Sequence, residues 1–469
     1  MKHIALLLLI IITVAMQSCI EDGISSSSAD QPTFSTDSLK LGVVFTEQGS
    51  TTHRFLVYNR HDKIININSI ELRDKTQNVF RLNVDGESGS EFQNVEIRPN
   101  DSIYVFVEAT LPPNGKIGPL TISNTLDFTT LGVTKSVVIT ADGIDVTRLK
   151  AKIVDTDTRL TAERPYQVFD SLVVAPGVTL TIDPGAHLYF HDKSELIVRG
   201  SLRVNGTTES PVNMTGDRTG NVVASIPFEL MSGQWGGIYF ATTSSASKMV
   251  NTSIRNMSYG VVVDSVAAST PDNPALYLLN CQIHNSAGYI LQAAHSAVTA
   301  IGTELTDAAN GIVYVRGGNL TMNHCTIANY YLFSALGGPA LQLDHINAET
   351  DDLSGLPKLQ ADITNTIIYG NGTDISHGDL TGTTVTLRRC LLKSAGTDDD
   401  NFINCLWDTD PTYYTVREDY LFDYRLKPES PAIQAADPAL TLPDAAIDRY
   451  GLPRLTPPSL GAYEYTPAD

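Results

Sequence analysis

The sequence of 469 residues is poor in cysteine and in positive charge. Five cysteines are too few for a disulfide-rich scaffold of this length. There are 52 aspartates and glutamates but only 32 lysines and arginines, so the formal net charge at pH 7 is −20. This balance opposes binding to nucleic acid or anionic lipid, and it would repel a polyanionic glycan unless calcium intervened. We therefore expect no nucleic-acid partner.

Long apolar runs are also scarce. The run at residues 4–16 follows Lys2 and His3, and it is too short to span a membrane comfortably. Its position is that of a secretory h-region, so residues 1–18 are predicted to be a cleaved signal peptide. Loss of Lys2 with this peptide makes the net charge −21.

The residues that follow the apolar run suggest how the chain is anchored. Met16-Gln17-Ser18-Cys19 resembles a bacterial lipobox, although Met16 and Gln17 depart from its usual residues. The resemblance implies lipidation of Cys19 and a membrane anchor, and the acidic pair Glu21-Asp22 resembles a tag for export to the outer face. An ordinary secretory signal is the alternative. We expect a cell-surface outer-membrane lipoprotein in which residues 19–32 form a flexible tether.

Residues 33–145 have a sequence pattern typical of a β-sandwich. Turn-rich segments separate eight alternating stretches, at 39–45, 53–58, 64–72, 80–84, 95–97, 102–109, 121–128 and 135–140. Such short strands predict an antiparallel sandwich. The segment resembles the immunoglobulin-like modules that precede repeat domains in exported bacterial proteins. It holds no catalytic constellation, and we expect His53 and His61 to be surface residues.

One short pattern returns from about residue 249 to residue 392. It reads apolar, any, apolar, two residues that are often polar, a small residue, any, apolar. Alternation with a period of two is typical of a strand, and the shift of one at the centre predicts a bend that re-aims the next strand. Asn251, Asn280 and Asn365 occupy the bend, and asparagine tolerates the left-handed conformation that it needs.

The small residue after each bend gives the spacing of the repeat. Successive gaps are 29, 22, 22, 41 and 24 positions along the series Thr252, Cys281, Thr303, Cys325, Thr366 and Cys390. A period in this range is typical of a solenoid whose turns bury their faces against their neighbours. The gap of 41 is near two turns, and Leu341, Leu343, Ile346 and Ala348 fit the missing copy. We therefore predict an all-β chain in which residues 150–405 form a parallel β-helix.

The same spacing bears on the cysteines. Cys281 and Cys325 have the Thr303 turn between them, which separates them by roughly 10 Å at the usual strand spacing. That distance exceeds the reach of a disulfide, so we expect buried thiols. Disulfide pairing of Cys390 with Cys405 remains open.

Three phrases carry a resemblance to a known superfamily. They lie at residues 173–186, 196–207 and 233–238, where alternating apolar residues are broken by glycine and proline at the corners. In this order they resemble the opening turns of right-handed parallel β-helix proteins of the pectin-lyase-like superfamily. The resemblance covers about residues 172–392 and implies the right-handed form of the solenoid.

The tail carries a second resemblance. Residues 426–433, 448–454 and 460–464 resemble the closing segment of bacterial surface β-helix proteins of the choice-of-anchor Q type, although Gln434 replaces that family's usual aspartate. We expect residues 406–469 to be a capping segment, because a solenoid end exposes strand edges and apolar cross-section. Asp448 and Arg454 are candidates for an ion pair that fixes the turn between them.

Acidic clusters are the candidates for chemistry. Asp398, Asp399 and Asp400 are candidate catalytic residues, and Asp351 and Asp352 are candidate calcium ligands, with calcium required only by a lyase. Both clusters lie among Gly, Ser and Thr, where solvated loop acids are usual. Asp264, Asp307 and Asp374 occupy different registers and are not expected to form one site.

Other candidate motifs are weaker. The His-Gly pair in Ser376-His377-Gly378-Asp379 resembles that of polygalacturonases, but the motifs that accompany it in those enzymes are not found upstream, so no catalytic role is expected there. Four further histidines lack metal-ligand spacing and are expected in turns or at the surface: His284, His295, His324 and His345.

Two functions remain open because this fold hosts both. The first is a non-catalytic, adhesin-like lipoprotein that binds glycan or protein through the flank of the β-helix, as a monomer. The alternative is a polysaccharide lyase or glycoside hydrolase.

Overall fold

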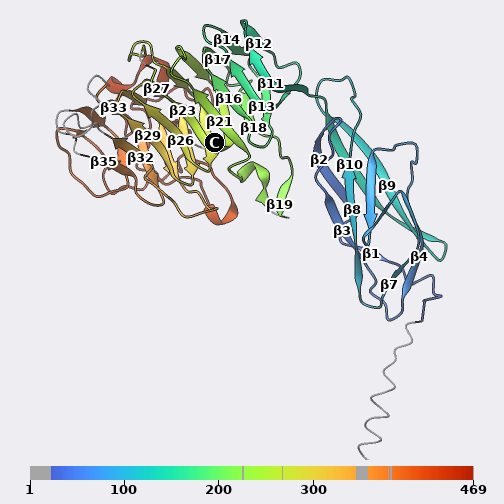
Figure 1. Ribbon diagram of the computed structural model, residues 1–469. Coiled ribbons are helices and arrows are strands. Elements are labelled where there is room, and N and C mark those ends of the chain that lie inside the picture. The colour runs from blue at the N-terminus through green and yellow to red at the C-terminus, as the bar shows by residue number, and fades with distance from the viewer. Residues whose placement is uncertain are drawn as a thin grey trace, which may run out of the picture. The chain divides into compact units, whose positions relative to one another are not determined.

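The computed structural model describes residues 23–223, 226–266, 268–344, 357–378, 380 and 383–467, and the chain divides after Asp145 into two units. Both units are built from strands (Figure 1). In the described ranges no helix is both long and apolar enough to cross a membrane.

The first unit holds two five-stranded sheets. Its strands are β1 (Thr33–Phe34), β2 (Ser38–Phe45), β3 (His53–Tyr58), β4 (Ile65–Leu72), β5 (Phe80–Val84), β6 (Glu87–Gly89), β7 (Glu91–Ile97), β8 (Ser102–Ala109), β9 (Leu120–Thr130) and β10 (Val133–Ile144). One sheet has the order β1-β3-β8-β5-β6 and the other β2-β10-β9-β4-β7. Every second side chain is buried along β8, so Ile103, Val105 and Val107 enter a core shared by both sheets.

All eight stretches that the sequence predicts as strands overlap strands of this unit. Two short strands, β1 and β6, were not predicted. The prediction of a purely antiparallel unit is wrong at one place, because β10 pairs with β2 in parallel. Because β2 and β10 are far apart in the sequence, the alternation of side chains within each strand does not show whether the two pair in parallel or antiparallel.

The predicted tether is also corrected for its described part, residues 23–32. Ser25 and Gln31 are buried. The backbone N–H of Ser25 donates to the carbonyl of Ile64 at 2.8 Å, and Gln31 Nε2 donates to the carbonyl of Thr130 at 3.2 Å. These residues are therefore part of the first unit.

The second unit winds in successive turns, and we name its three faces A, B and C. Face A comprises β12 (Thr158–Leu160), β14 (Thr179–Ile182), β17 (Ser201–Asn205), β22 (Ser247–Val250), β24 (Leu276–Leu279), β27 (Ala297–Ile301), β30 (Asn319–Asn323), β33 (Gln360–Thr364), β36 (Thr384–Arg388) and β38 (Phe402–Ile403). Face B comprises β15 (His187–Phe190), β18 (Val212–Gly216), β25 (Gln282–Ser286), β28 (Glu304–Ala308), β31 (Thr326–Asn329), β34 (Ile367–Gly370) and β37 (Leu391–Leu392).

Face C comprises β16 (Glu195–Val198), β21 (Trp235–Phe240), β26 (Tyr289–Ala294), β29 (Gly311–Arg316), β32 (Leu341–Asp344) and β35 (Ile375–His377). Three long strands run through faces B and C: β11 (Thr147–Val154), β13 (Tyr166–Val174) and β23 (Thr252–Val263). Outside the faces lie β19 (Asn221–Val223), β20 (Ile226–Pro227), and the 3₁₀ helices η1 (Phe228–Leu230), η2 (Arg417–Asp419), η3 (Pro438–Leu440) and η4 (Pro443–Ala445).

The strands within each face pair in parallel with those of the next turn, from β14 with β17 through β33 with β36. One hydrophobic core runs through the unit, and the ring of its fully buried Trp235 stacks on Phe190 with centroids 4.0 Å apart. Such long parallel sheets around one core are consistent with a β-helix.

The predicted bends are confirmed where face A turns into face B. Asn251, Asn280 and Asn365 have φ of 42°, 52° and 51°. The corner positions of other turns share this left-handed conformation: Gly302, His324, Arg389 and Asn404. Tolerance of positive φ therefore explains the asparagines, and the small residue that follows each bend faces the core.

The interpretation of the 41-residue gap as two turns is wrong. Thr326 pairs directly with Ile367, so Cys325 and Thr366 belong to adjacent turns. Leu341 and Leu343 lie on face C within the first of these turns, and residues 330–340 form an insertion before them. Ile346 and Ala348 lie outside the described residues.

Most of the C-terminal segment lies along the solenoid flank rather than across its end. Arg449 Nη1 donates to the carbonyl of Asn280 at 2.9 Å, and the backbone N–H of Gly461 donates to the carbonyl of Asn365 at 3.0 Å. The hydroxyl of Tyr463 donates to Glu304 on β28, so this part of the segment lies against the middle of the solenoid. A second core forms between this segment and the outer side of face B, where Tyr424 and Leu460 are buried.

The proposed ion pair in the tail has a different partner. Arg454 Nη1 lies 3.8 Å from Glu464 Oε2, with both side chains almost fully buried. Asp448 instead accepts hydrogen bonds from the backbone N–H groups of Tyr450 and Leu452, each at 2.9 Å. Asp448 therefore fixes the turn without pairing with Arg454.

Candidate functional site

The acidic loop at the end of the solenoid uses the carboxylates of Asp398 and Asp399 to bind its own backbone N–H groups. Asp399 Oδ1 accepts from the N–H groups of Asn401 and Phe402 at 2.7 and 2.8 Å. Asp398 accepts from Trp407 Nε1 at 3.1 Å and from two backbone N–H groups, and these bonds lower its pKa. Such contacts are those of turn-stabilising carboxylates. Asp400 is exposed beside them.

Asp351, Asp352, Asp379 and His345 lie outside the described residues. Within the described ranges, no group of three or more His, Cys, Asp and Glu side chains is placed to hold a metal ion.

The remaining histidine and aspartate candidates are dispersed. His295 and His324 occupy left-handed bends, as expected for turns, but both are buried rather than at the surface. Asp264 accepts from the hydroxyl of Tyr239, whereas Asp374 accepts from the backbone N–H of Ser394 at 2.8 Å. Asp307 is buried under the C-terminal segment. The three aspartates therefore form no common site.

Cys281 and Cys325 are free and fully buried, and register places the Thr303 turn between them. Cys390 and Cys405 occupy equivalent positions in adjacent turns, because Leu391 pairs with Leu406. Burial, followed by the neighbouring Cys405, raises the pKa of the Cys390 thiol.

Face C carries a continuous row of outward side chains that the sequence did not indicate. We call it the C-face row: Tyr239, Val262, Gln292, Tyr314 and Gln342, each in register with the next. With adjacent strands about 4.8 Å apart, these five positions extend over about 19 Å. The strands that bear them lie side by side from β21 to β32 in Figure 1.

Hydrogen bonds hold the side chains of this row in fixed orientations. The hydroxyl of Tyr239 donates to Asp264 Oδ2 at 2.6 Å, and that of the flanking Tyr289 donates to Gln342 Oε1 at 3.1 Å. The rings of Tyr289 and Tyr314 lie 5.4 Å apart. Together with the flanking Tyr289 and Asp264, the row therefore forms a pre-organised strip of aromatic rings, amides and a carboxylate.

The phenols of the row are not suited to act as bases. The hydrogen bond to Asp264 raises the pKa of Tyr239. Burial, followed by the Asp344 carboxylate, raises the pKa of Tyr314 to about 12, and burial also raises the pKa of Tyr289. All three phenols are therefore neutral hydrogen-bonding groups at pH 7.

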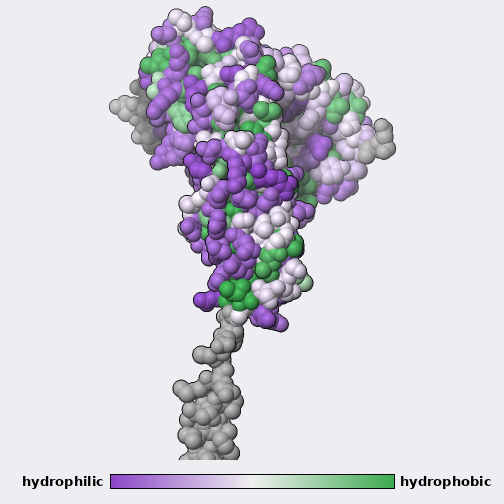
Figure 2. All heavy atoms as spheres, turned by 90° about the vertical axis from the view of Figure 1, so that its right-hand side faces the viewer, coloured by the Kyte–Doolittle hydropathy of each residue, from purple (hydrophilic) through white to green (hydrophobic). Residues whose placement is uncertain are grey.

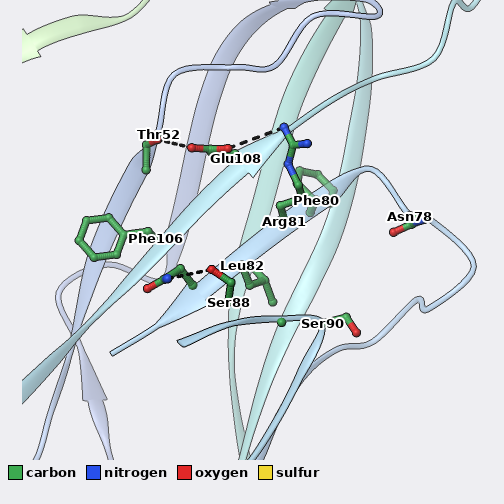
Figure 3. Close-up of a pocket in the computed structure, with 11 residues that line it drawn as sticks. Thr52, Asn78, Phe80, Arg81, Leu82, Ser88, Ser90, Phe106 and Glu108 are labelled. Carbon is green, nitrogen blue, oxygen red and sulfur yellow. Dashed lines mark hydrogen bonds and ion pairs between the residues drawn. The ribbon is translucent and has the colours of Figure 1, made fainter. Parts of the chain in front are cut away.

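A broad depression of about 660 Å³ in the first unit is lined mainly by residues of β5, β6 and β8 (Figure 3). Its polar and charged side chains bind one another. Glu108 accepts a hydrogen bond from Thr52 and lies 3.7 Å from Arg81, and Asn83 donates to Ser88 at 3.0 Å. The face of this unit shown in Figure 2 is mainly polar, with small scattered apolar patches. Exposed ion pairs of this kind contribute little energy, and the depression holds no catalytic grouping.

Comparison with known proteins adds little to this geometry. No family model and no curated protein matches the sequence. A structure of a family 123 glycoside hydrolase from Clostridium perfringens, which hydrolyses glycolipid glycans, matches with 8% identity over 24% of this chain and 25% of that chain, at a TM-score of 0.18. A protein of unknown function from Porphyromonas gingivalis W83 matches with 13% identity over 27% and 60% of the two chains, at a TM-score of 0.17. The chain thus covers less than two thirds of either protein, and similarity at this level carries no functional argument.

Proposed function

We propose that this protein is a non-catalytic surface lipoprotein that binds glycan through the C-face row. In this proposal residues 33–145 are an immunoglobulin-like spacer, and residues 150–405 are a right-handed β-helix of the pectin-lyase-like kind. The observation that carries the proposal is the strip of tyrosine rings and amides in register on one open face.

The chemistry of the strip matches that of a neutral saccharide. Aromatic rings pack against the C–H faces of sugar rings, and amides and carboxylates exchange hydrogen bonds with sugar hydroxyls. The row places one side chain on each of five successive strands, which suits a ligand that is itself a chain. Its phenols are neutral, and the acids at residues 398 and 399 are engaged in turns at another place, so a binding role is favoured over hydrolysis or elimination.

A glycan array tests the binding role. The wild type is expected to bind at least one neutral glycan, and Tyr314→Ala is expected to weaken that binding at least tenfold if a sugar ring on Tyr314 gains as much as the about 1–3 kcal/mol that a nucleic-acid base gains on an aromatic ring. Tyr104→Ala, which removes an exposed tyrosine from the first unit, is the matched control. Retention of full binding by Tyr314→Ala, with unchanged thermal stability, would refute the assignment.

The anchor is proposed separately, on the lipobox-like residues 16–19. Cys19 lies outside the described residues, so the proposal rests on sequence alone. Metabolic labelling with a fatty acid is expected to mark the wild type but not Cys19→Ser, and the label should fractionate with the outer membrane. A labelled Cys19→Ser protein, or an unlabelled wild type, would contradict this anchor.

A further inference from the structure

The chain contains four Asn-Gly dipeptides, which the fold holds in different ways: Asn114-Gly115, Asn205-Gly206, Asn310-Gly311 and Asn371-Gly372. Such a dipeptide can lose ammonia without a catalyst, because the backbone nitrogen of the glycine attacks the side-chain carbonyl carbon of the asparagine. Glycine favours this attack, since it has no side chain to crowd the nitrogen and adopts most backbone conformations. The attack needs an asparagine side chain that can turn and a glycine N–H that no hydrogen bond holds.

The dipeptide Asn114-Gly115 of the first unit is held at both reacting groups. The Gly115 N–H donates to Asp145 Oδ2 at 2.8 Å. Asn114 Nδ2 donates to the carbonyl of Gly143 at 3.2 Å, and Asn114 Oδ1 accepts from the N–H of Lys116 at 2.7 Å. The nitrogen that would attack and the carbon that it would attack are therefore both fixed by the fold.

The strands of the solenoid protect two more of these dipeptides. The Gly206 N–H donates to the carbonyl of Val250 at 3.0 Å, and Gly206 is buried. Gly311 is buried at the start of β29, in register with Tyr289 of the preceding turn. The asparagines before these glycines are exposed, but the glycines that would attack are not.

The dipeptide Asn371-Gly372 differs from the other three. Both residues are exposed in the segment between β34 and β35. Among the described residues, neither the Asn371 side chain nor the Gly372 N–H has a hydrogen-bond partner. The flanking groups are held, because the Asn371 N–H donates to the carbonyl of Asn329 at 2.7 Å and Lys393 Nζ donates to the carbonyl of Gly372 at 2.7 Å. This segment therefore fixes its ends and leaves the two reacting groups free.

We propose that Asn371 is a site of spontaneous deamidation, with water as the only co-reactant. The Gly372 nitrogen bonds to Asn371 Cγ, and the side-chain NH₂ group leaves as ammonia with the proton of that nitrogen, which closes a succinimide ring. Water then adds to either carbonyl carbon of the ring and breaks the bond of that carbon to the nitrogen. Opening at the side-chain carbon gives aspartate, and opening at the backbone carbon gives isoaspartate, whose backbone is longer by a methylene. Either product places a new carboxylate in the segment that Lys393 contacts.

Incubation of the whole chain in water enriched in oxygen-18, at mildly alkaline pH, followed by peptide mass mapping tests this site. Each asparagine that deamidates acquires the heavy oxygen, which separates new product from any present at the start. Asn371 is expected to gain the label at least tenfold faster than Asn114, Asn205 and Asn310. Asn371→Gln should remove this product, because closure of the larger ring from glutamine is much slower.

Two controls test whether the fold causes the difference. In the chain unfolded by urea, all four asparagines should gain label at similar rates. Asp145→Ala frees the Gly115 N–H, so it should speed labelling of Asn114 several-fold and leave that of Asn371 unchanged. Thermal melting establishes that this variant is folded before incubation.

Three results would overturn the proposal: no label at Asn371, labelling of Asn371 no faster than that of the other three asparagines, or a preference for Asn371 that persists in urea. The main comparison is made within one folded wild-type chain, so it does not depend on whether any variant folds.

Discussion

Replacement of Asp307 by asparagine is expected to change how the stability of the solenoid unit depends on pH. Asp307 is 1% exposed and accepts from the hydroxyl of Tyr424 at 2.6 and 2.7 Å and from the N–H of Tyr330 at 3.0 Å. Burial outweighs these bonds and raises its pKa to about 7. Asparagine has the same shape and tolerates the left-handed φ of 59° at this position, so Asp307→Asn removes the titration with little other change.

The sign follows from proton linkage. Between about pH 4 and pH 7 the folded chain holds a proton on Asp307 that the unfolded chain has released, so this group's stabilisation is present at low pH and is lost as the pH rises through 7. A difference of about 3 units between the folded and unfolded pKa corresponds to at most about 4 kcal/mol. Asp307→Asn has no proton to release here, so it does not lose this stability. Its free energy of unfolding minus that of the wild type should therefore rise by up to about 4 kcal/mol from pH 4 to pH 7.5.

Denaturation followed by tryptophan fluorescence measures this effect, because both tryptophans, Trp235 and Trp407, lie in the second unit. The lowered pKa of His187 makes stability rise with pH between about 4 and 6.5, but it is common to both proteins and cancels in their difference. A stability difference that stays constant from pH 4 to pH 7.5 would refute the reasoning.

Two further predictions concern the corners of the solenoid. Asn365→Ala should lower the free energy of unfolding by about 2–4 kcal/mol, because alanine is strained at φ 51° and loses the hydrogen bonds to the Asp437 backbone. Asn365→Gly should lose only the hydrogen bonds, because glycine is not strained at this φ. Equal losses of stability for the two variants in urea titrations would contradict this reasoning. Mild oxidation should join Cys390 to Cys405, since adjacent strands lie within disulfide reach, and should stabilise the chain by about 3 kcal/mol for a loop of this length. Peptide mass mapping that still finds four free thiols after oxidation would exclude the bond.

The parts of the fold that are encoded locally could be predicted from the sequence. Alternation locates strands such as β3 and β8, and the change of parity at Asn280 locates a corner, because each depends on residues only a few positions apart. The insertion within the turn that holds Cys325 was misread, since an insertion and a missing copy change the spacing in the same way. The parallel pairing of β10 with β2 joins segments about a hundred residues apart and leaves no local pattern.

The candidate sites depend still more on long-range contacts. Tyr239, Gln292 and Tyr314 form one row only because of the register between turns, which insertions of different length conceal in the sequence. The pairing of Arg454 with Glu464 was missed for a related reason: Asp448 is nearer to Arg454 along the chain, but its carboxylate is used by the turn. Outward polar residues that recur once per turn would have been the signal for the row.

The central claim, that the protein binds glycan without cleaving it, is tested most directly by incubation of the soluble chain with a panel of neutral and uronic glycans, with and without calcium. Bound glycan and released product are measured in the same samples by pull-down and mass spectrometry. The account predicts intact glycan on the protein and no product in any sample. Product that accumulates with time and disappears with Asp399→Ala would contradict it and establish the enzymatic alternative.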